Sequence, residues 1–170
     1  MQCWAHLLFQ AAAQLAGLSL LCTLIMVLFS ITGRLWPSVS ITGADAYAGY
    51  FTAATAFLAL APTLKRGEHI RVTLLFNHLQ PKAQHALDVL CHLLALLMAC
   101  ALALFSVRLV LQSHSFNDIS TGLDATPLWI PQMGMALGCI LFALAFLTDL
   151  IRLLQGETLH SATGEMARTE

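Results

Sequence analysis

The chain has 170 residues, of which 58% are apolar and 10% charged, and its formal net charge is −1. Soluble domains carry roughly 25% charged residues, so this composition excludes a protein whose surface faces water on all sides. The near-neutral charge provides no basic surface for nucleic acid, and the scattered histidines and cysteines follow no zinc-like spacing.

Long uncharged runs indicate an all-α membrane protein with four transmembrane helices. The predicted spans cover about residues 7–31, 46–64, 82–108 and 131–154, each near or above the roughly 20 residues that cross a hydrocarbon core. Residues 1–155 thus form one predicted membrane domain, followed by a polar cytoplasmic tail over residues 156–170. No Lys or Arg precedes the first run, which is longer than a signal-peptide core, so we expect it to remain as a helix.

Two charged residues flank the connection between the first and second spans. Arg34 is the only basic residue there, and Asp45 comes just before the second span. An acidic residue at a helix start can cap free N–H groups and meet the positive end of the helix dipole. A ligand for a coupling ion is the alternative role for Asp45. Both residues are also candidates for contacts with headgroups or a partner.

Small residues predict helix-contact faces on the second and fourth spans. In lipid there is no hydrophobic drive between helices, so close backbone approach through Gly and Ala is what lets them pack. We expect these faces to contact another helical protein, although the second span could also be simply alanine-rich. The candidate helix-contact residues are Gly49, Ala53, Ala56, Gly134 and Gly138.

The hinge between the second and third spans is dense in charge. Apolar residues recur every three or four positions from Val72 to Leu79, which predicts a short amphipathic helix over about 69–79, lying along the membrane surface. An ordinary connecting loop is the alternative. The candidates for interfacial or partner contacts in and beside this hinge are Lys65, Arg66, Glu68, His69 and Arg71.

Three polar residues share one face near the start of the third span. His85, Asp88 and His92 are spaced i, i+3 and i+7, and Asp and neutral His are both metal ligands and proton carriers. A metal or proton-relay site is therefore one interpretation. A polar stripe near headgroup level that contacts a partner is the other.

Basic residues lie mainly on one side of the predicted membrane domain. The hinge and the C-terminal end hold Lys65, Arg66, Arg71, Lys82, Arg152 and Arg168. Because Lys and Arg favour the cytoplasm, we expect the hinge and both termini to be cytoplasmic and the loop over 112–130 to face outward. Asp149 and Arg152, three positions apart, can pair with each other at the membrane edge.

The hinge sequence resembles a known family. The run Lys65–Val72 (KRGEHIRV), the closing Leu79–Pro81 and the stretch Ser120–Pro131 (STGLDATPLWIP) are similar to the small membrane subunit of tripartite ATP-independent periplasmic (TRAP) transporters, the DctQ-like family. Arg34 and Asp45 fit the same pattern, and the likeness covers about residues 10–155. The sequence departs from the family at Thr73, where an acidic residue is common, and in having only Asp45 where a pair is common.

The resemblance implies a non-catalytic scaffold in the bacterial inner membrane, with four helices. Such subunits brace a large membrane subunit that carries substrate and sodium, while a periplasmic binding protein delivers a carboxylate-type solute. Because the middles of the four spans are nearly free of charge and transporters bind substrate through polar groups near the midplane, we expect no catalytic, substrate-binding or metal residues in this chain, and no cofactor. The expected partners are the large subunit, the binding protein and membrane lipids.

Two other membrane functions compete with this interpretation. A haem-bearing anchor subunit of a redox enzyme needs axial ligands on different helices at matching depth, and only His92 lies well inside a predicted span. A drug–proton antiporter needs a carboxylate inside the membrane, whereas Asp45 lies at the end of a span. The uncharged middles of the spans favour a scaffold.

Overall fold

The computed structural model describes residues 2–36, 43–65, 81–120, 122 and 125–155. Within these residues the chain forms α1 (Gln2–Leu35), α2 (Ala44–Lys65), α4 (Pro81–Ser115) and α5 (Trp129–Leu154). An isolated bridge between Ile119 and Pro127 lies in the connection before α5. The predicted all-α class is confirmed for this part of the chain. The predicted amphipathic helix over 69–79 and the tail over 156–170 lie outside the described residues.

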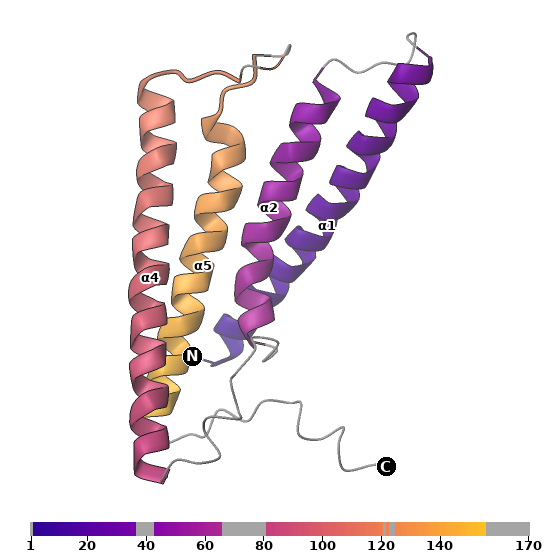
Figure 1. Cartoon of the computed structure of the whole chain (residues 1–170). Coiled ribbons are helices and arrows are strands. Elements are labelled where there is room, and N and C mark those ends of the chain that lie inside the picture. Colours follow the sequence, from indigo (N-terminus) through magenta and orange to yellow (C-terminus); the bar gives the residue numbers. More distant parts are fainter. Residues whose placement is uncertain (1, 37–42, 66–80, 121, 123–124, 156–170) are drawn as a thin grey trace, which may run out of the picture.

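The helices form two antiparallel hairpins, α1–α2 and α4–α5, that are joined through α2 and α5. Figure 1 shows them side by side in the order α4, α5, α2, α1. The inner helices α2 and α5 each pack along two neighbours, while α1 and α4 are the outer members of the row. Near its start, α1 also meets α5. The outer helices therefore leave most of their apolar surface uncovered.

Three of these helices are long and apolar enough to cross a membrane: Leu7–Leu35 in α1, His85–Ser115 in α4 and Trp129–Leu154 in α5. With 22 residues, α2 is about 33 Å long, but Tyr47, Tyr50 and several threonines make it less apolar. The threonine hydroxyls donate to carbonyls one turn back, as Thr52 does to Ala48 at 2.7 Å. These polar side chains are thus compatible with a helix in an apolar environment.

A small core forms where α1, α2 and α5 meet. It consists of Phe9, Ala12, Ala61, Leu141 and Ala145, and Ala61 and Ala145 are 0% exposed. The alanines allow the three backbones to approach closely, which is how helices gain dispersion energy in lipid. Phe9 fills the space that these small side chains leave.

Two helices approach each other closely at Gly138 of α5. A Cβ atom placed on this glycine would lie 2.5 Å from both the carbonyl carbon and the oxygen of Phe57 in α2. One turn earlier, a Cβ on Gly134 would lie 3.3 Å from the Cβ of Ala54. The two glycines predicted as helix-contact residues therefore lie against α2 of the same chain, and α2 covers the face that they form.

Replacing Gly138 with alanine should destabilise the fold. The added methyl group would overlap the Phe57 carbonyl, so α2 and α5 would have to separate, at a cost of about 1–3 kcal/mol. We expect a lower midpoint of thermal unfolding in a mild detergent.

Gly49→Ala provides the matched control, because a Cβ at this position meets no atom within 4 Å. Its unfolding midpoint should equal or exceed that of the wild type, since alanine favours helix more than glycine does. Equal midpoints for the two variants would contradict the tight α2–α5 contact.

Candidate functional site

Lys65 and Asp149 form an ion pair between the last residue of α2 and the last turns of α5. The Lys65 Nζ atom lies 2.6 Å from Asp149 Oδ1, and the side chains are 19% and 11% exposed, respectively. The same ammonium donates to Thr148 Oγ1 at 2.5 Å and lies 5.3 Å from the centre of the Phe9 ring. Lys65, predicted as a partner contact of the hinge, is thus engaged inside its own chain.

This ion pair ties three helices together at one end of the bundle. Phe9 comes from α1, Lys65 from α2, and Thr148 and Asp149 from α5. The Thr148 hydroxyl donates its proton to the Ala145 carbonyl at 2.8 Å, so its oxygen is free to accept from Lys65. Charges that are largely removed from water are tolerated when they are paired and hydrogen-bonded, and both conditions are met here.

The sequence suggested a different partner for Asp149. The spacing of Asp149 and Arg152 indicated a local pair, whereas the structure pairs Asp149 with a lysine 84 positions away. Antiparallel packing of α2 and α5 brings the end of α2 beside the end of α5, so Lys65 reaches the carboxylate. The only hint in the sequence was that a basic residue, Lys65, lies at the end of α2 and an acidic residue, Asp149, near the end of α5.

At the other end of the α1–α2 hairpin, Arg34 pairs with Asp45. Their side chains are 77% and 74% exposed, and Arg34 Nη2 lies 3.5 Å from Asp45 Oδ2. Ser30 of α1 donates to the other carboxylate oxygen at 2.5 Å. Asp45 also lies in the first turn of α2, where a negative charge meets the helix dipole. The two residues thus join the start of α2 to the end of α1.

Two tyrosines of α2 hold the connection between α4 and α5. The Tyr47 hydroxyl lies 2.9 Å from Thr126 Oγ1, and the Tyr50 hydroxyl donates to Ser120 Oγ at 2.6 Å. Sequence reasoning missed both contacts, since they join residues 79 and 70 positions apart. Their only sequence signal was a pair of tyrosines three positions apart near the start of the second predicted span.

Backbone hydrogen bonds also join described residues within the same connection. The Ser120 N–H donates to the Thr126 carbonyl at 2.8 Å, and the Leu128 N–H donates to the Asp118 carbonyl at 3.0 Å. Asn117 and Ala125 have φ angles of 51° and 46°, a left-handed conformation that costs energy for residues other than glycine. The described parts of this connection, residues 117–120 and 125–128, are therefore bonded to each other and to α2.

The polar face of α4 does not gather into a metal site. No group of three or more His, Cys, Asp or Glu residues is placed to hold a metal ion in the part of the chain that is described. The His92 Nδ1 atom lies 2.8 Å from the Asp88 carbonyl, and its ring contacts Phe146 edge-on at a centroid distance of 6.4 Å. His85 is exposed.

The remaining predicted contact residues divide into two groups. Gly49, Ala53 and Ala56 are all exposed on α2, at spacings that place them on one face of the helix. They lie on a face that neither α1 nor α5 covers, in contrast to Gly134 and Gly138. The hinge candidates Arg66, Glu68, His69 and Arg71 lie outside the described residues.

Lys65→Met should destabilise the bundle by about 3 kcal/mol, because it leaves the largely buried Asp149 carboxylate without its partner. Thermal or denaturant unfolding in a mild detergent measures this effect. Adding Asp149→Leu to the same protein should restore much of the loss, since the unpaired charge is then removed as well.

Arg34→Gln is the control for this change, because it breaks an ion pair that is mostly exposed. It should cost less than about 1 kcal/mol. If the Lys65 and Arg34 variants lose the same stability, the burial of the Lys65–Asp149 pair contributes nothing.

Comparison with known proteins identifies the family of this bundle. No individual curated protein matches the chain. The family model described as "Tripartite ATP-independent periplasmic transporters, DctQ component" matches residues 23–156, which is well over half of the chain and includes α2, α4, α5 and part of α1. The chain therefore belongs to the DctQ family, the small membrane subunits of TRAP transporters.

Proposed function

We propose that this chain is a non-catalytic scaffold that braces the large membrane subunit of a sodium-coupled TRAP transporter, which takes up a carboxylate-type solute delivered by a periplasmic binding protein. Family membership supports the transporter assignment. The observation that supports the scaffold role is that charged side chains of this chain form ion pairs between its own helices. Lys65 is paired with Asp149 and Arg34 with Asp45, so these residues hold helices together instead of lining a path for solute.

In this proposal α2 is a fourth transmembrane helix, although it is the least apolar. It lies between α1 and α5 and contacts both, and its length of about 33 Å matches a hydrocarbon core of roughly 30 Å. A helix packed along two spanning neighbours shares their depth. With four spans, both termini lie on the cytoplasmic side of the bacterial inner membrane, where the positive-inside preference places the basic hinge.

The proposed contact face for the large subunit is the exposed stripe of α2 that contains Gly49, Ala53 and Ala56. Thr52 lies on the same face and is also exposed, while its hydroxyl is bonded to its own helix. The stripe therefore presents small side chains with no unsatisfied threonine hydroxyl, a surface against which a partner helix can pack closely. Ser120 and Thr126, which Tyr50 and Tyr47 bind, lie on the side that we assign to the periplasm, where they belong to a surface that the binding protein can contact.

Ala53→Leu should weaken assembly with the large membrane subunit without unfolding the small one. Its side chain is exposed, so the larger residue fits the isolated chain but separates a partner helix that packs there. We expect the affinity of the Ala53→Leu variant for the large subunit to fall roughly tenfold, which corresponds to a loss of about 1.4 kcal/mol in binding free energy. Co-purification in mild detergent and uptake in cells both measure it.

Ala11→Leu is the matched control, since Ala11 is an exposed alanine on α1. It should leave assembly and uptake unchanged. Unchanged co-purification of the Ala53 variant, or equal losses in both variants, would remove the α2 stripe from the proposal.

The proposed orientation predicts the location of fused reporters. A reporter inserted at Gly122 should behave as periplasmic, and one fused after Gln155 as cytoplasmic. Paired alkaline phosphatase and fluorescent-protein fusions give opposite readouts on the two sides. A cytoplasmic signal at Gly122 would contradict the four-span orientation.

A further inference from the structure

One charged side chain of the described bundle, Arg108, faces away from the other helices. The buried stripe of α4 consists of Ala99, Ser106 and Ser113, which are 2%, 4% and 2% exposed, and Ser106 donates to Cys139 of α5 at 3.3 Å. Arg108 comes two residues after Ser106, which is about 200° further around the helix, and it is exposed. It therefore lies on the side of α4 opposite α5.

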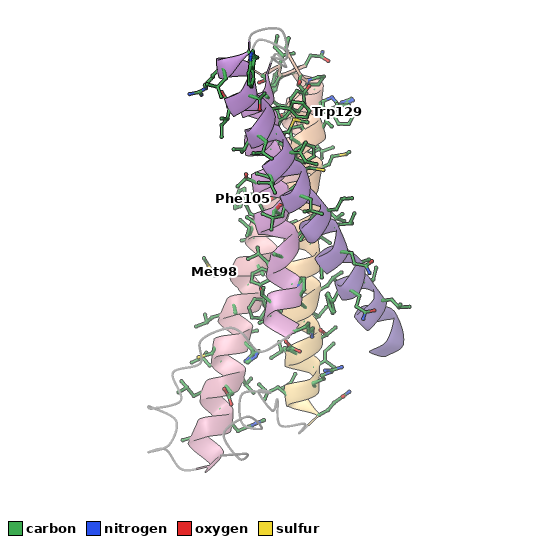
Figure 2. All side chains as sticks on the ribbon, turned by 90° about the vertical axis from the view of Figure 1, so that its right-hand side faces the viewer. Met98, Phe105 and Trp129 are labelled. Atoms are coloured by element: carbon green, nitrogen blue, oxygen red, sulfur yellow. The ribbon has the colours of Figure 1, made fainter. Side chains whose placement is uncertain are left out.

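The rest of this outward face is apolar. Met98 is 74% exposed, Leu104 69% and Phe105 66%. Figure 2 shows Met98, Phe105 and Trp129 at successive heights along the bundle, with Trp129 nearest the end that carries the α4–α5 connection. Beyond Arg108, Gln112 follows one turn later and is also exposed. Arg108 and Gln112 thus add polar groups at the end of this apolar face, beside Leu111, which is 63% exposed.

The depth of Arg108 follows from the charges along α4. The stretch from Val89 to Val107 contains no Asp, Glu, Lys or Arg, and Asp88 and Arg108 at its two ends are about 30 Å apart along the helix axis. This spacing equals the thickness of a typical hydrocarbon core. Arg108 then lies at the boundary between acyl chains and headgroups.

Contacts between α4 and α5 agree with this placement. His92 meets Phe146, so Asp88, one turn before His92, lies near the level of Asp149 and its ion pair with Lys65. At the other end His114 contacts Trp129 edge-on at a centroid distance of 5.5 Å, which places that tryptophan about 9 Å beyond Arg108. Tryptophan favours the headgroup region.

Arg108 has no carboxylate partner among the described residues, whose ion pairs are Arg34–Asp45 and Lys65–Asp149. A guanidinium group stays charged, and its planar array of donors binds phosphate through two parallel hydrogen bonds. At the boundary of the hydrocarbon the abundant anion is the lipid phosphate, and a long side chain can extend toward it from an apolar surface.

We propose that Arg108 and Gln112 bind the phosphate of an anionic phospholipid whose acyl chains lie along Met98, Leu104 and Phe105. An anionic lipid is favoured over a zwitterionic one, because the charge of its phosphate is not balanced by a cationic group in the same headgroup. The site requires α4 to span the membrane but is independent of the proposed scaffold role.

Native mass spectrometry of the full-length chain in mild detergent tests this site. The probes are phosphatidylglycerol and phosphatidylcholine with identical acyl chains. The wild type should bind phosphatidylglycerol more tightly, and Arg108→Gln should lose roughly tenfold in that affinity, the loss expected for a charge-assisted hydrogen bond. Because no partner protein is present, failure here leaves the scaffold proposal intact.

Arg34→Gln is the matched control, since it removes an arginine at the same end of the bundle whose guanidinium is already paired with Asp45, and it should keep the wild-type affinity. Equal affinities of Arg108→Gln and the wild type, or equal losses in both variants, would overturn the proposal. So would unchanged lipid binding combined with lost co-purification of a membrane partner, which would assign Arg108 to a protein carboxylate.

Arg108→Lys keeps the charge but not the two parallel donors, and it decides the test if the Gln variant fails to fold. Binding of phosphatidylglycerol weaker than in the wild type supports the site, and unchanged binding overturns it.

Discussion

The two helical hairpins are joined through α2 and α5, and this contact depends on the absence of a side chain at Gly138. The Phe57 carbonyl occupies the space where a Cβ would lie. In water such a contact would be reinforced by burial of apolar surface, but in lipid the surroundings are as apolar as the helices. What remains is dispersion, which weakens steeply with distance. A gap of roughly 0.5–1 Å at this point would therefore remove about a quarter to a half of the dispersion energy of the atoms in contact there.

Polar contacts secure the same pair of inner helices at both ends. Lys65 and Asp149 close one end, and Tyr47 and Tyr50 attach the other end of α2 to the connection that leads into α5. Hydrogen bonds and ion pairs are stronger electrostatically in a medium of low dielectric. They also fix direction, which dispersion does not. Together with the glycine contact they set how far α2 can slide or rotate along α5.

The sequence predicted the helices better than their contacts. Uncharged runs located the helices, because these runs depend on local composition. The spacing of Gly134 and Gly138 predicted a face for another protein, whereas these two glycines lie against α2 of the same chain. The partner of Asp149 and the role of Tyr50 depend on which helix lies beside which, and that is decided by surface shape over the whole bundle. Arg152 was the nearest opposite charge in sequence, but α2 brings Lys65 closer in space. Composition also showed that α2 carries small residues. It did not show that the side with Ala54 and Phe57 packs against α5 while the side with Ala53 stays exposed.

The composition of the uncovered side of α2 supports the proposed scaffold role. Among the described helices, α2 is not one of the three that are long and apolar enough to span a membrane by composition alone, but it packs between α1 and α5, which are. Its hydroxyl-bearing and small residues gain little from lipid chains, which pack poorly against a surface without long side chains. A partner helix can approach such a surface closely and recover the missing dispersion. By contrast, α1 and α4 expose long apolar side chains such as Leu18 and Met98, which suit contact with lipid. This difference favours α2, and not the outer helices, as the side on which the large subunit would be braced.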